Sequence, residues 1–183
     1  MMQVNLNTYN NKWYKPGSVL KRFIWHYTNG FFLKSGIFPF YGMKVAILRL
    51  FGAKIGKSVL IKPYVSIKYP WLLTIGNHCW IGENVWIDNL VNVEIGSHVC
   101  ISQGAYLLTG NHNYKKKDFD LIIKGIVIED GVWIGAKSVV CPGVTCKTHS
   151  VLAVGSVAGA DLEPYYIYGG IPAVKIKERI ISE

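Results

Sequence analysis

The chain has 183 residues, of which 50% are hydrophobic, and it carries a formal net charge of +9 at pH 7. This length and composition exclude a disordered chain and are typical of one domain with a terminal attachment. The positive charge favours an anionic ligand or surface, so nucleic acid, a phosphorylated cofactor and an anionic bilayer all fit it.

The N-terminal stretch MMQVNLNTYNNKWYKPGS is polar and has no apolar segment of the kind found in secretory signals. We therefore expect a cytoplasmic protein, in which cysteines stay reduced. The chain has no C-x-x-C pair, so its cysteines are expected to fill small apolar spaces rather than bind a metal. They are Cys79, Cys100, Cys141 and Cys146.

The next stretch is aromatic and basic, and it predicts two short helices at about 18–34 and 41–51, separated by Gly36 and Pro39. Lysines and arginines interrupt every apolar run well short of the length that spans a bilayer. Residues 1–52 are therefore expected to cap the open end of the structure that follows. A surface that also rests on anionic lipid head groups is the alternative, and both roles are compatible.

From residue 55 onward, aliphatic residues recur every six positions. The series is Ile55, Ile61, Ile67, Leu73, then Ile75, Ile81, Ile87, Val93, then Ile95, Ile101, Leu107, and finally Ile128, Ile134, Val140, Cys146, Leu152. A slip of two residues ends each of the first two groups, so the phase returns after 20 residues. Neither a helical period of 3.6 nor a strand period of 2 fits this spacing. It predicts a three-sided hexapeptide solenoid over residues 53–164, with glycines tolerated at its corners.

One interruption breaks the six-residue series after Leu107, where thirteen extra residues are inserted. The excursion, residues 109–125, departs from the regular wall near His112. Insertions in solenoids form loops on one face, which is often the binding face, so a solvated turn and a functional loop are both compatible with its position.

The C-terminal residues 165–183 contain Gly169, Gly170 and Pro172 and then alternate apolar and basic positions. They predict a C-terminal cap, and their lysines would also suit the rim of a phosphorylated ligand.

Three of these motifs together resemble the hexapeptide-repeat acetyltransferases, and in particular the galactoside and maltose O-acetyltransferases. They are TGNHNY (109–114), VWIGAKSVVCPGV (132–144) and GGIPAVKIKER (169–179). The stretch LRLFGAKIGKSVLIKPYVSIKYPWLLTIGNHCWIG (48–82) is similar to the colanic acid biosynthesis acetyltransferases of exopolysaccharide clusters. The resemblance implies a left-handed parallel β-helix, a homotrimer with active sites between subunits, and acetyl-CoA as the donor.

The resemblance also implies roles for individual residues, which we carry over position by position. His112 matches the catalytic base of the family motif. The implied CoA contacts are Trp133, Ala136, Val154, Gly159, Ala160, Lys175 and Lys177. Relatives have threonine and lysine where this chain has Gly159 and Ala160, so only main-chain contacts are expected there. On the acceptor side the match gives Asn84 and, less closely because the coil length differs, Asp88.

A single histidine is sufficient for this chemistry. A sugar hydroxyl that attacks a thioester must lose a proton, and a neutral imidazole, with an ordinary pKa of about 6.5, accepts it near neutral pH. Direct attack needs no Ser-His-Asp set and no activated cysteine. Backbone N–H groups at a solenoid corner could stabilise the oxyanion.

Other aromatic side chains have predicted positions on the solenoid. His78 and His98 each lie three residues after an inward isoleucine, so their rings should stack on neighbouring coils. Trp80, Trp86 and Trp133 fall in a slot that faces outward, where tryptophan serves subunit contacts or stacks on a sugar or on adenine.

We therefore predict an acetyl-CoA-dependent O-acetyltransferase that acts on a sugar of exopolysaccharide, capsule or O-antigen biosynthesis. An N-acetyltransferase for an amino sugar and a non-catalytic trimeric scaffold remain alternatives. A metal enzyme like the gamma-class carbonic anhydrases is a further alternative, although the chain lacks their close H-x4-H pair. Nucleic-acid binding is not expected, because the basic residues are spread along the chain without a recognised motif.

Overall fold

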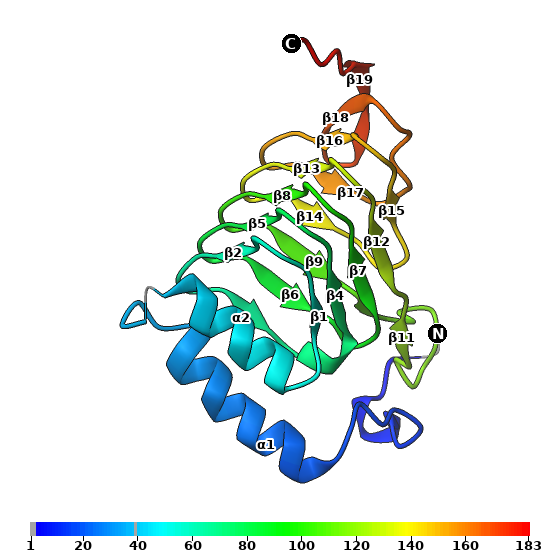
Figure 1. Cartoon of the computed structure of the whole chain (residues 1–183). Helices are drawn as coiled ribbons and strands as arrows, with labels where there is room; N and C mark the ends of the chain where they lie inside the picture. Colours follow the sequence, from blue (N-terminus) through cyan, green and yellow to red (C-terminus); the bar gives the residue numbers. More distant parts are fainter. Residues whose placement is uncertain (1–2, 39) are drawn as a thin grey trace.

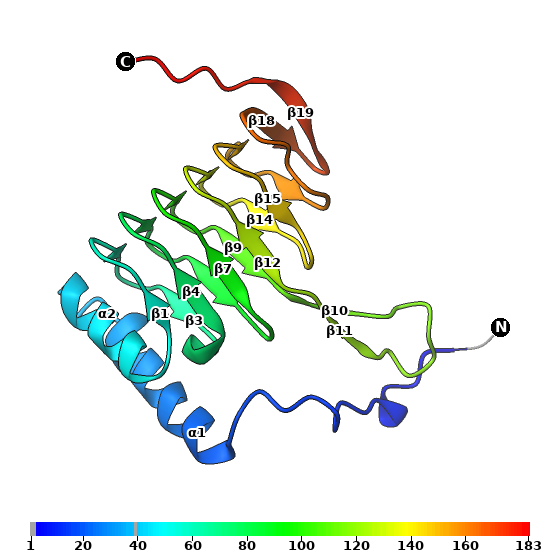
Figure 2. The same ribbon diagram turned by 45° about the vertical axis from the view of Figure 1, so that its right-hand side comes forward.

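The computed structural model describes residues 3–38 and 40–183, and its main body is a three-sided parallel β-helix (Figures 1 and 2). Two helices cover the N-terminal end of the prism and a β-hairpin covers the other end. A second hairpin projects sideways from the third coil (Figure 2). The six-residue spacing is thus confirmed as the repeat of a solenoid.

Each side of the prism is one sheet of short strands. Sheet A contains β1 (Lys54–Ile55), β4 (Leu73–Ile75), β7 (Val93–Ile95), β12 (Ile126–Ile128) and β15 (Thr145–Cys146). Sheet B contains β2 (Leu60–Ile61), β5 (Trp80–Ile81), β8 (Cys100–Ile101), β13 (Trp133–Ile134), β16 (Val151–Leu152), β18 (Tyr166–Gly170) and β19 (Ala173–Glu178). Sheet C contains β3 (Ser66–Ile67), β6 (Trp86–Asp88), β9 (Tyr106–Leu108), β14 (Val139–Val140) and β17 (Val157–Ala158). The chain visits the sheets in the order A, B, C, which gives A/B, B/C and C/A corners.

The strand register confirms the predicted phase. Ile55 stacks on Ile75 and Ile75 on Ile95, so the coil length is the one that the slip of two implied. Ile95 then pairs with Ile128 across the insertion. Ile128 pairs with Cys146, because the last coils omit the slip. Every inward residue of the predicted series except the half-buried Ile55 is at most 2% exposed, and together they form the continuous core of the prism.

The corners explain the small and polar residues between the strands. The residue three positions after an inward aliphatic often adopts a left-handed backbone, as at His78 (φ 56°) and His98 (φ 59°). Their rings stack at 5.1 Å, as the sequence predicted. A Cβ added to Gly76 would lie 2.6 Å from the backbone of Gly96, so the stacked corners leave no room for a side chain at that position.

The N-terminal helices lie close to where the sequence placed them. The first begins after the N-cap Ser18 as α1 (Val19–Thr28) and continues as a π-helical turn, η2 (Asn29–Leu33). The second is α2 (Tyr41–Leu50). Two 3₁₀ turns, η1 (Leu6–Thr8) and η3 (Pro70–Leu72), complete the helical elements of the described residues. None of these helices is both long and apolar enough to cross a bilayer.

The predicted excursion is an antiparallel hairpin of β10 (Gly110–His112) and β11 (Leu121–Ile123), which we call the arm. It leaves the C/A corner between β9 and β12. The N-terminal segment runs from the tip of the arm along the side of the molecule to α1 (Figure 2). The backbone N–H of Asn5 donates to the carbonyl of Lys117 at 3.0 Å, and the Thr8 hydroxyl donates to the Asp118 carboxylate.

Lys44 in the N-terminal cap carries a buried polar group without a hydrogen-bond partner in the described part of the chain. Lys44 on α2 is fully buried, and its Nζ has no hydrogen-bond partner among the described residues. Burial lowers the pKa of Lys44 from its ordinary value of 10.5. The unfolded chain therefore binds more protons than the folded chain between the lowered pKa and 10.5. The contribution of Lys44 to stability consequently rises with pH across that window and opposes folding below it.

We expect Lys44→Met to raise the free energy of unfolding at pH 7 by about 1 to 3 kcal/mol, because it removes an unsatisfied buried donor and keeps a similar volume. Urea unfolding at several pH values measures the change, and the gain should shrink at alkaline pH. Lys54→Met, at an exposed position of β1, is the matched control and should be close to neutral. A destabilised Lys44→Met variant would show that the ammonium is solvated in the folded state.

Candidate active site

The arm holds His112 in a defined orientation. Residue 112 ends β10 and pairs with Leu121 of β11. The imidazole stacks on the Phe119 ring with 4.4 Å between centroids and an angle of 8° between planes. Its Nδ1 lies 2.9 Å from the Phe119 carbonyl oxygen. The ring centroid of Tyr9, from the N-terminal segment, lies 5.7 Å from the centroid of the imidazole.

These contacts fix the tautomer of His112. A carbonyl oxygen can only accept a hydrogen bond, so Nδ1 must carry the proton and donate it to Phe119. In the neutral ring, Nε2 is then the unprotonated nitrogen. An imidazole held in this way can accept a proton at Nε2 without first changing tautomer.

His112 lines a hollow of about 580 Å³ between the arm, the C/A corner and the N-terminal segment. We call this hollow the acceptor pocket. Its lining residues are Tyr9, Asn11, Tyr14, Pro16, Arg22, Lys68, Tyr69, Asp88, Leu90, Leu108, Gly110, Asn111, His112 and Leu121. The structure therefore brings together two residues that the sequence analysis singled out, His112 and Asp88.

Asp88 is nearly buried in the wall of this pocket and is not a free carboxylate. Its Oδ1 lies 2.9 Å from the Nζ of Lys68, and its Oδ2 accepts a hydrogen bond of 3.3 Å from the Tyr106 hydroxyl. Burial, together with the negative charge of Asp88, raises the pKa of Tyr106 to about 12. Tyr106 therefore stays a hydrogen-bond donor at neutral pH, and this network holds Asp88 at the pocket wall.

The N-terminal segment supplies pocket residues that the sequence analysis did not identify. Tyr14 donates from its hydroxyl to the Leu90 carbonyl at 2.7 Å, and burial raises the pKa of Tyr14, so this donor also stays protonated. Arg22 enters the pocket from α1. No local motif marks these contacts, because the segment is far from the arm in sequence. The sequence does offer one signal for a positively charged N-terminal region, because residues 1–82 contain no Asp or Glu.

The residues predicted to contact CoA fall on two different edges of sheet C. Ala136 and Val154 lie at neighbouring B/C corners, where the Gly155 N–H donates to the Ala136 carbonyl at 2.9 Å. Gly159 and Ala160 are exposed at the C/A corner. Asn84 is at a B/C corner with φ 58° and does not line the acceptor pocket of its own chain.

Sheet B carries the remaining predicted CoA residues: Trp133 and Lys177 at outward register positions, and Lys175 opposite Tyr168, which pairs with the inward Leu152. In the strand register, Trp133 pairs with Val151, Val151 with Ile167, and Ile167 with Lys177, so these residues follow one another across the sheet. Lys175 on β19 places its Nζ 3.8 Å above the ring of Tyr166. Trp80, Trp86 and Trp133 are 61%, 46% and 48% exposed, which confirms their outward direction.

A hollow of about 490 Å³ lies on this side of the prism, next to the B/C corner. Trp80 and Trp133 form its aromatic walls, and Gly82 and Gln103 belong to its corner edge. The indole N–H of Trp133 donates to Ser102 at 2.9 Å and fixes the ring. The structure thus places an ordered tryptophan beside a hollow at the predicted CoA edge.

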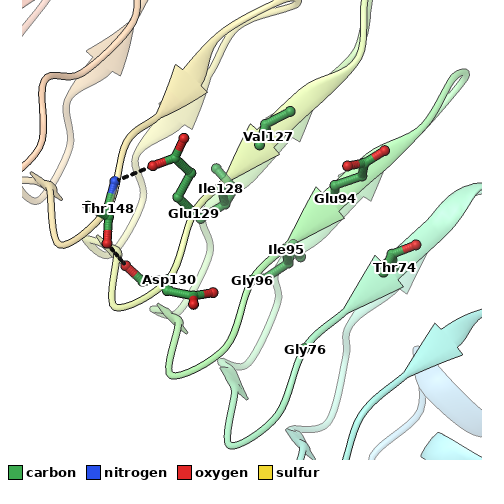
Figure 3. A pocket seen from close by; sticks show the side chains of 10 residues that line it. All are labelled: Thr74, Gly76, Glu94, Ile95, Gly96, Val127, Ile128, Glu129, Asp130 and Thr148. Atoms are coloured by element: carbon green, nitrogen blue, oxygen red, sulfur yellow. Dashed lines mark hydrogen bonds between the residues drawn. The ribbon is translucent and has the colours of Figure 1, made fainter.

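A third hollow, of about 560 Å³ on sheet A, is acidic (Figure 3). Two of its three carboxylates serve the corners: Glu129 accepts from the Thr148 N–H and Asp130 from the Ser97 N–H, each at 2.7 Å. None of the predicted site residues lines it. Negative charge here disfavours a phosphorylated ligand, so we assign these side chains to the coil corners.

Across residues 3–38 and 40–183, no three or more His, Cys, Asp and Glu side chains are grouped to hold a metal ion. The cysteines in that range are free thiols, and Cys79 and Cys146 are buried in the core.

The fold and the arm define a hexapeptide β-helix with one inserted hairpin, and comparison with known proteins identifies its family. No protein-family model matches the chain. It is 36% identical over 172 residues, covering 94% of both chains, to an Escherichia coli protein named colanic acid biosynthesis acetyltransferase WcaF. It is 31% identical over 129 residues to the galactoside O-acetyltransferase of Escherichia coli, covering 69% of this chain and 64% of the relative.

Among solved structures, the hexapeptide-repeat acetyltransferase VCA0836 of Vibrio cholerae superposes with a TM-score of 0.79 at 28% identity, covering 87% of this chain and 90% of that one. In its complex with acetyl-CoA the TM-score is 0.81 at 26% identity, covering 91% and 93%. The chain belongs to the hexapeptide-repeat acetyltransferases.

Proposed function

We propose that the protein transfers the acetyl group of acetyl-CoA to a sugar hydroxyl, with His112 as the general base, in exopolysaccharide, capsule or O-antigen biosynthesis. The observation that carries this proposal is the hydrogen bond between His112 Nδ1 and the Phe119 carbonyl. It leaves Nε2 as the proton acceptor in a pocket large enough for a sugar ring. The similarity to WcaF supports the polysaccharide context.

In the proposed reaction the sugar oxygen attacks the carbonyl carbon of the thioester while Nε2 of His112 takes the hydroxyl proton. The tetrahedral intermediate then collapses, the carbon–sulfur bond breaks, and the imidazolium returns the proton to the leaving CoA thiolate. The products are the acetyl ester and CoA. Tyr9 and Phe119 keep the ring in place during both proton transfers.

We expect His112→Ala to lower kcat about 10²- to 10⁴-fold, the usual range for loss of a general base. In the wild type, kcat/KM should rise with pH on the acid side of its profile, and this limb should be absent in the variant. CoA release on incubation with sugar acceptors measures turnover.

The matched control is His149→Ala, because this half-buried histidine stacks on Tyr165 at 4.9 Å and does not line the acceptor pocket. It should retain the rate and the pH profile. A His112→Ala enzyme that keeps its kcat and loses only affinity for the acceptor would make His112 a binding residue.

We further propose a homotrimer in which each active site combines two chains. The support is the division of the predicted residues: Asp88, His112, Gly159 and Ala160 belong to the C/A edge, whereas Asn84, Ala136 and Val154 belong to the B/C edge. Trp133 stands beside the B/C edge and would stack on CoA there. In a closed ring, the C/A edge of one subunit meets the B/C edge of the next.

Mixed oligomers test this arrangement. His112→Ala and Trp133→Ala should each be impaired alone, whereas a 1:1 mixture refolded together should recover activity at about a quarter of the wild-type sites, as random assembly of a threefold ring requires. Analytical ultracentrifugation should show a trimer. No recovery in mixed trimers, or full turnover by a monomer, would place the whole site within one chain.

We also propose that α1 rests on an anionic bilayer. Its outer face exposes an apolar stripe of Leu20, Phe23, Ile24 and Tyr27, which are between 47% and 67% exposed, and Phe31 of η2 continues it. The spacing follows successive turns of one helix face. Lys12 and Lys15 before α1 and Lys34 after it are exposed, in a region without acidic residues, which suits a negatively charged lipid surface.

Phe23→Glu should abolish sedimentation with phosphatidylglycerol vesicles at low salt, because it places a charge in the apolar stripe. Binding of the wild type should weaken with salt, since each basic residue contributes about 1 kcal/mol near the surface. Ile180→Glu, an equally drastic change at an exposed C-terminal position, should bind like the wild type. A Phe23→Glu variant that binds vesicles normally but loses its oligomeric state would assign the stripe to a subunit contact.

A further inference from the structure

A basic hollow adjoins the acceptor pocket. Its volume is about 330 Å³, and it shares Arg22, Lys68 and Tyr69 with that pocket. Its lining residues are Arg22, Trp25, His26, Asn29, Lys34, Ser66, Lys68, Tyr69 and Trp86. Four of these residues are Arg, Lys or His and none is Asp or Glu, so the hollow carries positive charge beside the proposed reaction site.

The inner face of α1 builds this hollow. Arg22, Trp25, His26 and Asn29 recur at the spacing of a single helix face, opposite the apolar stripe. Trp25 is 2% exposed, and its indole N–H donates to the Ile67 carbonyl of β3 at 2.9 Å. This anchor fixes the rotation of α1 and so directs Arg22 and His26 toward the first coil.

Two of the charged side chains in the hollow, Arg22 and Lys34, have no ion-pair partner among the described residues. Arg22 makes no ion pair among the described residues, and its Nε is buried without a hydrogen-bond partner. Lys34 is exposed and likewise has no carboxylate partner in that part of the chain. Only Lys68 is paired, with Asp88 on the side of the acceptor pocket. A buried guanidinium donor without a partner is costly unless a ligand supplies an acceptor.

We infer that the acceptor is a sugar carrying a phosphate or diphosphate, and that Arg22, His26, Lys34 and Lys68 hold this group while the sugar hydroxyl lies beside His112. The inference rests on the proposed function and names the substrate class of the same site. The planar fork of an arginine matches phosphate oxygens in a bidentate manner, and the surrounding lysines add charge without demanding a fixed geometry.

The position of the hollow favours an acceptor phosphate over a bilayer head group. Arg22 and Lys68 line both hollows, so a ligand that they bind also adjoins the acceptor pocket. The apolar stripe that we assign to the bilayer is on the opposite face of α1. A nucleoside diphosphate and a lipid diphosphate offer the same phosphate chemistry, and a choice of acceptors distinguishes them.

The experiment compares CoA release from a neutral hexose, the hexose 1-phosphate, a nucleoside diphosphate hexose and a hexose joined through diphosphate to a short water-soluble polyprenol. The wild type should show a kcat/KM at least about 10-fold higher for phosphorylated acceptors. Arg22→Gln should lower that value about 10- to 100-fold, mainly through KM, and so reduce the preference for phosphorylated over neutral acceptors. Preference between the last two acceptors identifies the source of the phosphate.

Two further variants separate a specific site from general charge. Lys34→Gln, on the exposed side of the hollow, should lower kcat/KM for phosphorylated acceptors, as Arg22→Gln does, and should leave the melting temperature unchanged. Lys57→Gln removes an exposed lysine of the first coil outside both hollows and should behave like the wild type.

Equal kcat/KM for neutral and phosphorylated acceptors, or an equal loss for both in Arg22→Gln, would overturn the inference and leave the acetyltransferase function intact. So would an Arg22→Gln enzyme with normal kinetics and impaired vesicle binding. If CoA is released with none of the acceptors, the proposed function fails. Calorimetry with inorganic pyrophosphate at saturating CoA then tests whether the hollow binds a diphosphate. Binding by the wild type and not by Arg22→Gln would support it, and equal or absent binding would refute it.

Discussion

The stacking of one coil on the next is the constraint on which the rest of this structure depends. The short strands of the prism pair with the coils above and below them, and each coil contributes buried aliphatic side chains from every sheet to the core. The corners must therefore superpose closely, and this requirement excludes side chains at positions such as Gly76. The prism is rigid for the same reason and has little freedom to form a pocket within itself.

Four of the predicted CoA residues lie at corners of the repeat, whereas the predicted catalytic histidine lies in a segment that the repeat does not contain. The arm interrupts the coil at the C/A corner and carries the histidine, the N-terminal segment crosses to the arm, and the final hairpin extends sheet B. The acceptor pocket lies where the arm and the N-terminal segment meet the wall of the prism. Hydrogen bonds from Tyr14 to Leu90 and from Asn5 to Lys117 tie these parts together.

The ten residues of helix α1 present two different faces, one to the prism and one to the surroundings. Its inner face uses Trp25 to dock on the first coil and presents Arg22 to the pocket, and its outer face exposes apolar side chains to the surroundings. An ammonium or guanidinium group near low-dielectric walls attracts anions more strongly than it does in open water. In the functions that we propose, the same helix brings a phosphorylated acceptor to the arm near a lipid surface.

The sequence by itself determined the solenoid, because the six-residue period is a local property of the chain that each coil repeats. The inward isoleucines, the stacking of His78 on His98, the outward tryptophans and the place of the insertion all follow from counting residues. The hand of the helix did not follow from the period, since a six-residue repeat is compatible with either hand, and it was obtained from the family resemblance. His112 was found because the break in the repeat falls beside it.

Only the tertiary structure showed that Arg22 and Tyr14 share a pocket with His112, that Asp88 is engaged by Lys68, and that the predicted CoA residues divide between two edges. These contacts join segments that are far apart in sequence, and no period or motif encodes them. They arise because the docking of Trp25 and the pairing of the N-terminal segment with the arm fix the path of the chain in space.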